Sequence, residues 1–298
     1  MRKFLCTIAA IFMAIAASAQ ALPSLLIPSD AASLSLSGST VAGRAGAFSI
    51  DDNASSMALS SSTLSVGATY GLWQPSVAKD NYIAAGGYWH SGKFAVGASF
   101  RRLGMPSQQA TNPNGTVSQL EAPFSPSEMA IGIGASYAVI DGLSVGLTAR
   151  YVRSALASSA KAGTVGADIS ATYTIGSLRT GLVVANLGPK VKYSETGYMQ
   201  PAVVRAGAAY TIIQGLSAQA ELSYLFAGAF GAGAGVEYGF KDMLFARAGF
   251  HYGSSSLGIP TYASVGLGGK FAGINIDVAY LFIGNLGNTL MFTLGYSL

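Results

Sequence analysis

The stretch DGLSVGLTARYVRS, residues 141–154, decides how the fold of this chain is interpreted. Its apolar and polar positions alternate strictly: Leu143, Val145, Leu147, Ala149 and Tyr151 on one parity, and Ser144, Gly146, Thr148 and Arg150 on the other. A period of two is typical of a β-strand with one apolar and one polar face. In a soluble protein the apolar face would pack in a core, whereas in a membrane protein it would contact lipid.

The composition favours the membrane. Charged residues make up only 10% of the 298 residues, against roughly 25% in a typical soluble domain, and the mean hydropathy is positive. After the first residues, apolar runs are broken every few positions by Gly, Ser, Thr or a charge. Nothing therefore approaches the ~20 consecutive apolar residues of a spanning helix. A closed β-barrel is the membrane architecture that fits both observations.

The first nineteen residues have the organisation of an export signal. Arg2 and Lys3 precede an apolar run from Phe4 to Ala16, and Ala17-Ser18-Ala19 fits a cleavage site. The alternative is a true membrane anchor. Cys6 is the only cysteine and lies in this segment, so the mature chain is expected to have no disulfide, thiol nucleophile or cysteine–metal site.

From residue 63 to 298 the sequence predicts fourteen strands, most of them 10 to 12 residues long. A tilted membrane strand needs ~9–11 residues, whereas ordinary globular strands average ~5–6. The expected strands are residues 63–73, 81–90, 93–103, 127–139, 143–154, 163–175, 178–187, 202–212, 216–226, 232–240, 243–252, 261–271, 274–284 and 288–298.

The connections alternate between short and long. The even-numbered ones are tight, such as Asp141-Gly142 and Gly176-Ser177, and most carry the Gly or Asp of a two-residue hairpin. The odd-numbered ones are mostly longer, and the longest covers residues 104–126. Outer-membrane barrels have short periplasmic turns and longer external loops. The pattern predicts an all-β, fourteen-stranded antiparallel barrel in the outer membrane of a Gram-negative bacterium, with both termini periplasmic; the alternative is a soluble all-β protein.

Charged side chains share the polar parity, which we assign to the lumen because Arg or Lys facing mid-bilayer lipid costs roughly 2–4 kcal/mol. They form a predicted lumen charge network of Arg101, Arg150, Asp168, Arg205, Glu221, Glu237, Arg247 and Asp277. Two interpretations remain open: a selectivity ring or substrate path, or ion pairs that stiffen the barrel. The many Gly, Ala and Ser residues of this face indicate a crowded lumen.

Residues 20–62 form a third expected region, between the signal and the barrel of residues 63–298. The segment is rich in small residues, has no clean periodicity and is expected to begin at the periplasmic rim. It would plug the lumen or, alternatively, hang as a loose periplasmic tail.

Three stretches resemble the PorV/PorQ family of the type IX secretion system, which has FadL-like fourteen-stranded barrels. They are PSDAASLSLSGSTVA followed by DDNASSM (28–42 and 51–57), EMAIGIGASYAVIDGLSVGLTARYVRSAL (128–156) and NLGPKVKYSETGYMQPAVVRAGAAY (186–210). The last is more similar to PorV than to PorQ. Ser60-Ser61-Ser62 departs from the Asn-Pro-Ala that relatives tend to have there.

The resemblance implies a role in protein export. PorV-like members sit beside the large outer-membrane translocon barrel, receive cargo through its C-terminal signal domain and carry it to a cell-surface attachment complex, to which PorQ-like members belong. Apolar residues of two expected loops are candidate partner contacts, unless they pack against the barrel rim: Leu103, Met105, Leu120, Phe124, Tyr193, Tyr198 and Met199. The alternative function is a FadL-like transporter of small hydrophobic molecules.

The residues do not predict an enzyme. Neither His90 nor His251 has a carboxylate or cysteine at a ligand spacing, and GAGAGVEYG (231–239) opens a strand rather than a phosphate-binding helix. Asp51-Asp52-Asn53 lacks the rest of a calcium loop. We expect no cofactor and no metal. No basic run in the sequence points to a nucleic-acid partner.

Overall fold

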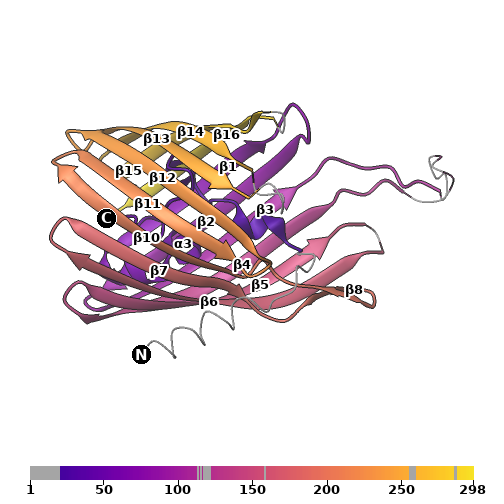
Figure 1. Cartoon of the computed structure of the whole chain (residues 1–298), viewed down its shortest axis with the longest axis horizontal. Helices are drawn as coiled ribbons and strands as arrows, with labels where there is room; N and C mark the ends of the chain where they lie inside the picture. Colours follow the sequence, from indigo (N-terminus) through magenta and orange to yellow (C-terminus); the bar gives the residue numbers. More distant parts are fainter. Residues whose placement is uncertain are drawn as a thin grey trace.

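A computed structural model of the chain describes residues 21–112, 114, 116, 122–157, 159–254, 260–284 and 287–298. Fourteen antiparallel strands close into a barrel, in which β1 pairs with β16 (Ser65 opposite Ser297) (Figure 1). The barrel strands are β1 (Leu64–Trp73), β2 (Asp80–Ser91), β3 (Phe94–Gly104), β4 (Ser127–Ile140), β5 (Leu143–Ala155), β6 (Lys161–Ile175), β7 (Leu178–Leu187), β10 (Val203–Ile213), β11 (Leu216–Leu225), β12 (Ala229–Phe240), β13 (Leu244–Gly253), β14 (Tyr262–Phe271), β15 (Ile274–Phe282) and β16 (Thr289–Ser297). The predicted fold is confirmed, and every predicted strand boundary lies within three residues of the observed one.

The barrel is inverted relative to a soluble protein, as the alternation in residues 141–154 predicts. In β5 the outward-facing Leu147 is 57% exposed and Tyr151 is 48% exposed, whereas Ser144 and Thr148 are buried on the lumen side. Alternation of this kind continues through most strands, so the exposed apolar side chains form the outer surface of the barrel. Within the described residues, no helix is both long enough and apolar enough to cross a membrane.

Residues 21–62, here called the N-terminal segment, run through the inside of the barrel (Figure 1). They contain η1 (Pro23–Leu26), α2 (Ala31–Ser35), α3 (Ser49–Asp52) and η2 (Ala54–Leu59). Asp30 caps α2 by accepting a hydrogen bond from the Ser33 backbone N–H, and Asn53 caps η2 through Ser55. Helices of four to six residues carry too little periodicity to be recognised from sequence, and none was predicted.

Small polar side chains attach the N-terminal segment to the lumen wall. The Ser55 N–H donates to Ser170 Oγ, Ser144 Oγ donates to the Ser55 carbonyl, and the hydroxyls of Ser37 and Ser264 are 2.8 Å apart. These bonds explain the serines and threonines of the polar parity: buried backbone groups of an irregular segment need partners, and short hydroxyl side chains supply them without filling the lumen.

The two ends of the described chain lie at opposite ends of the barrel. The Ala21 N–H donates to the Met199 carbonyl (3.0 Å), among the long connections, whereas Thr63 and Leu64 bond Leu298 beside the tight turns. We call these the long-loop end and the short-turn end. The expectation that the N-terminal segment begins at the short-turn rim is therefore wrong: its apolar start, including the buried Leu22 and Leu25, packs under the long connections, and the segment ends at the short-turn rim.

One long connection has structure of its own. Residues 188–202 contain a small hairpin, β8 (Val191–Tyr193) and β9 (Thr196–Tyr198), which the sequence was expected to leave as a loop. Val191 is fully buried against Leu22 and Leu25, so the hairpin covers the start of the N-terminal segment. Strands of three residues are too short to show a period of two.

A substitution at Gly146 can test whether the N-terminal segment packs closely against the lumen wall. A Cβ at this position would lie 2.8 Å from the Ala54 carbonyl carbon, whereas one at Gly269 on β14 would meet nothing. We predict that Gly146→Val yields a folded barrel in which trypsin or proteinase K cleaves residues 21–62 at least tenfold faster. Gly269→Val is the matched control and should be digested like the natural chain; equal protection of both variants would contradict the fit.

Candidate functional site

The predicted lumen charge network consists of separate ion-pair groups at different positions on the wall. Arg150 on β5 contacts Asp168 on β6 at 2.5 Å, with a second oxygen at 3.4 Å, and also bonds the Asn186 side chain at 2.7 Å. Arg205 lies 3.7 Å from Glu221. All of these groups point into the lumen, where burial makes a partner necessary.

A third group joins three strands. Arg247 on β13 contacts Glu237 on β12 at 2.6 Å and Asp277 on β15 at 2.5 Å. Each of these groups bridges strands that lie next to or near one another in the barrel order. The ion pairs therefore connect strands of the barrel wall to one another, and each basic side chain finds its acidic partner on a strand close to its own.

Arg101 differs from the other predicted members because its partners come from the N-terminal segment. Its guanidinium donates to the Leu25 carbonyl, and Ser99, on the same face of β3, donates to Asp51 at 2.9 Å. Asp51 also lies 3.8 Å from Arg150. From the sequence, Asp51 was considered only as part of the incomplete calcium motif Asp51-Asp52-Asn53. Its place beside Arg101 and Arg150 was therefore missed, although the paired acids of this motif were a signal that the position carries charge.

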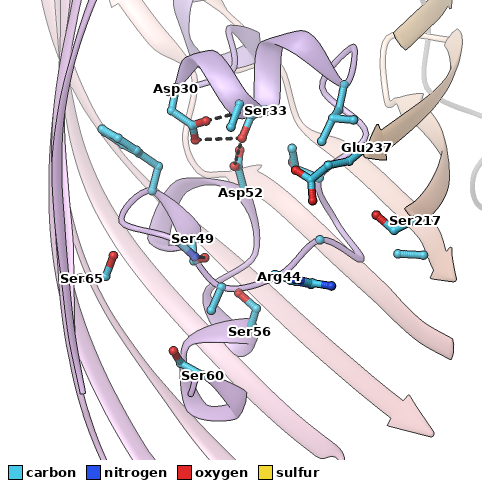
Figure 2. A pocket seen from close by; sticks show the side chains of 18 of the residues that line it. Asp30, Ser33, Arg44, Ser49, Asp52, Ser56, Ser60, Ser65, Ser217 and Glu237 are labelled. Atoms are coloured by element: carbon cyan, nitrogen blue, oxygen red, sulfur yellow. Dashed lines mark hydrogen bonds between the residues drawn. The ribbon is translucent and has the colours of Figure 1, made fainter. Parts of the chain in front are cut away.

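A cavity of about 630 Å³ opens at the short-turn end, between the N-terminal segment and the wall. Figure 2 shows Asp30 and Asp52 both directed at the Ser33 hydroxyl, with Arg44 reaching into the space from the connecting loop. Ser33 Oγ is 2.8 Å from Asp30 Oδ2 and 3.1 Å from Asp52 Oδ2. Desolvation and the neighbouring carboxylate of Asp30 raise the pKa of Asp52 to about 7, and desolvation also raises the pKa of Asp30.

A second cavity of about 470 Å³ lies at the long-loop end. Its lining is mainly apolar and comes from both the N-terminal segment and the wall, including Leu26, Ile27, Trp73, Leu225 and Ile283. Near the long-loop end the lumen is therefore less polar than the Gly, Ala and Ser residues of the polar parity suggest, because apolar residues of the N-terminal segment face apolar ends of the strands.

The candidate partner-contact residues differ in exposure. Leu103 is only 5% exposed and packs with Leu281 and Tyr82, so it is not a loop contact; it shares the lumen parity of Arg101. Met105 packs against the same cluster, and Tyr193 packs on Val191 and Leu22. Phe124, Tyr198 and Met199 are half-buried, and Leu120 lies outside the described residues.

The histidines lie apart from one another and take different roles. His90 is the second-last residue of β2, and its ring nitrogen lies 3.0 Å from the Gly92 carbonyl in the tight turn that follows, whereas His251 stacks on Tyr262 at 4.9 Å between ring centroids. The described residues contain no group of three or more His, Cys, Asp or Glu side chains with the geometry of a metal site.

Solved structures with this architecture are FadL-like outer-membrane channels. The monoaromatic hydrocarbon channel CymD superposes with a TM-score of 0.69 at 14% identity, covering 91% of this chain and 97% of its own. The toluene transporter TodX of Pseudomonas putida gives 0.69 at 13% identity over 91% and 98%, and a FadL homologue of Pseudomonas aeruginosa gives 0.61 at 12% over 91% and 98%. At such identities the likeness establishes the fold, and no curated protein sequence gave a match.

The family is established by sequence. The model of the type IX secretion system protein PorV matches residues 14–226, well over half of the chain, and this chain belongs to that family. It is therefore an outer-membrane β-barrel of the type IX secretion system, as the three resembling stretches predicted. Family and fold are those of transport and secretion components rather than of enzymes.

Arg150 offers a test of the wall ties. We predict that Arg150→Leu lowers the stability of the barrel by about 3–5 kcal/mol, because it leaves the buried Asp168 without its partner. The variant should lose its folded band on heat-modifiability gels at a clearly lower temperature than the natural protein. Arg153→Leu, on the exposed face of the same strand, is the control and should melt normally. Normal assembly and heat stability of Arg150→Leu would exclude the structural role.

Proposed function

We propose that this protein docks to the large translocon barrel of the type IX secretion system and binds cargo through its C-terminal signal domain, passing it toward the cell-surface attachment complex. In this proposal the long-loop end faces the cell exterior and the short-turn end faces the periplasm. The PorV family match supports the export role, and the partners implied by that family are protein surfaces rather than small substrates.

The observation that carries the docking role is the β3–β4 connection. Figure 1 shows the described residues of this connection beside the two strands, 105–112 and 122–126, extending well beyond the other connections of the long-loop end. Antiparallel pairing persists beyond the strands, because Gln108 and Phe124 exchange backbone hydrogen bonds of 2.7 and 3.0 Å and Met105 bonds Pro126. A projecting arm with a paired base presents its residues at a fixed angle, which lowers the entropic cost of binding a protein partner.

The β8–β9 hairpin is a second part of the proposed contact surface. Tyr193 and Tyr198 meet edge to face with ring centroids 6.0 Å apart, beside Met199. Their half-buried rings are held by the hairpin and by the start of the N-terminal segment. Aromatic side chains fixed in this way bury large areas on binding at little conformational cost.

The competing function is transport of small hydrophobic molecules, and the apolar cavity at the long-loop end is the observation that favours it. The hydrocarbon channel and the toluene transporter that share the fold also favour this function. For that function, however, the cavity needs a way out past the N-terminal segment, whose backbone is bonded to the wall along its length. We therefore place it second.

Shortening the projecting arm separates the two functions. Gln108 already pairs with Phe124, so residues 109–123 can be replaced by Asn-Gly, which closes a hairpin at that pair. Purified from outer membranes in mild detergent, the natural protein should co-elute with a very large barrel and exported cargo. The shortened variant should lose at least nine-tenths of that co-elution while keeping its heat-modifiable band.

The control applies the same operation to another hairpin. Leu156 and Ala160 are paired at the β5–β6 connection, so Asn-Gly can replace residues 157–159 there. This variant should retain its partners. A natural protein that elutes as a lone barrel with bound fatty acid would contradict docking and favour the transporter.

A further inference from the structure

The two lumen cavities have one lining residue in common. Asp52 lines the cavity at the short-turn end and also the cavity at the long-loop end. It belongs to the N-terminal segment, and its carboxylate meets Ser33 of α2. The contact between α3 and α2 therefore forms part of the partition between the two spaces.

The hydrogen bonds of this partition need an extra proton. The Ser33 hydroxyl lies within bonding distance of carboxylate oxygens of both Asp30 and Asp52, and the Ser33 N–H is already used by the other oxygen of Asp30 at 2.7 Å. A hydroxyl carries one hydrogen and can donate it to one acceptor. Both contacts become hydrogen bonds only when one carboxyl is protonated and donates to the hydroxyl oxygen.

The arginines near Asp30, Ser33 and Asp52, here called the cluster, make their hydrogen bonds and ion pairs with other groups. Arg205 donates to the backbone carbonyl of Asp52 rather than to its carboxylate, and Arg247 is held by Glu237 and Asp277. Among the described residues no ion pair reaches Asp30 or Asp52. The charged and titratable groups that face the cluster or line its cavities include Arg205 on β10, Glu221 on β11, Glu237 on β12, Arg247 and His251 on β13, Lys270 on β14, Asp277 on β15, Asp80 on β2, Arg101 on β3, Arg150 on β5, Arg179 on β7, Asp51 on α3 and Arg44 in the connecting loop.

We propose that Asp30, Ser33 and Asp52 form a proton-operated latch, which holds α2 against α3 and keeps the lumen closed between the two cavities. Loss of the shared proton leaves two carboxylates facing each other across one hydroxyl. Their repulsion separates α2 from α3 and admits water and small ions between the two cavities, while the bonds from Ala31, Val41 and Ser55 to the wall hold the rest of the segment in place. The proposed latch involves only residues inside the lumen, so it does not depend on which partner binds the exterior of the protein.

The direction of the pH dependence follows from where the proton is bound. The closed state binds it tightly, since the pKa of Asp52 is raised to about 7 from an ordinary value of 3.8. In the open state water solvates the carboxyl and its pKa returns toward the ordinary value. Closure is therefore fully favoured at low pH and lost as the pH rises through 7. One proton linked across this interval changes the ratio of closed to open by at most about a thousandfold.

Ion conduction measures the latch directly. The purified full-length mature protein is inserted into planar lipid bilayers, and current in KCl is recorded from pH 5 to pH 9. We expect low conductance at pH 5 and at least tenfold more current per inserted barrel at pH 9.

Two classes of variant should shift this curve in opposite directions. Asp52→Asn keeps a donor for Ser33 but cannot ionise, so it should stay closed at pH 9; Asp30→Asn should behave alike and serves if the first variant does not assemble. Ser33→Ala removes the hydroxyl between the carboxyls and should conduct already at pH 6. A merely structural role of Asp52 would instead make Asp52→Asn leak at every pH.

Asp242→Asn, in the tight turn after β12, is the matched control and should titrate like the natural protein. Heat-modifiability gels establish that each variant is folded before it is recorded. Equal current at pH 5 and pH 9 in the natural protein, or opening of both Asn variants at pH 9, would overturn the latch.

Discussion

The lumen of this barrel must satisfy its polar groups with very little room, and the rest of the structure follows from that constraint. The outer face is assigned to lipid, so most strand charges and most hydroxyls turn inward, with Arg153 on the exposed face of β5 as an exception. An irregular segment then fills the interior, and its backbone N–H and C=O groups also need partners. Serine, threonine and glycine on the wall meet both demands, because they bond the segment and leave space for it.

The ion pairs answer the same constraint for charges. Arg150, Arg205 and Arg247 each face an acid from a nearby strand, so their charges are neutralised within the wall. Arg101 and Asp51 instead join the wall to the N-terminal segment. Buried pairs of this kind add little net stability but become costly when one partner is lost. This favours their interpretation as ties over a selectivity ring.

The sequence predicted the barrel well because its signals are repeated. Period-two alternation and tight turns recur along the chain, so the errors at individual strand ends stay small. The N-terminal segment was harder, since helices such as α3 contain one turn and their position depends on contacts with distant strands. Leu103 was misassigned because a strand end was taken as a loop, although its parity with Arg101 places it inside. Asp30 and Asp52, 22 positions apart, meet at the Ser33 hydroxyl through a fold within the segment, and no spacing rule predicts this arrangement.

The path of the N-terminal segment has a consequence for how the barrel is made. The segment enters among the long connections and leaves at the short-turn rim, and it touches β14, β15 and β16 on one side of the β1–β16 seam and β4, β5 and β6 beyond the other. Once β1 and β16 are paired, the N-terminal segment cannot pass lengthwise through the closed barrel without breaking its hydrogen bonds to the wall along the barrel axis. Residues 21–62 must therefore be in position before β16 pairs with β1, so that the wall closes around a segment already in place.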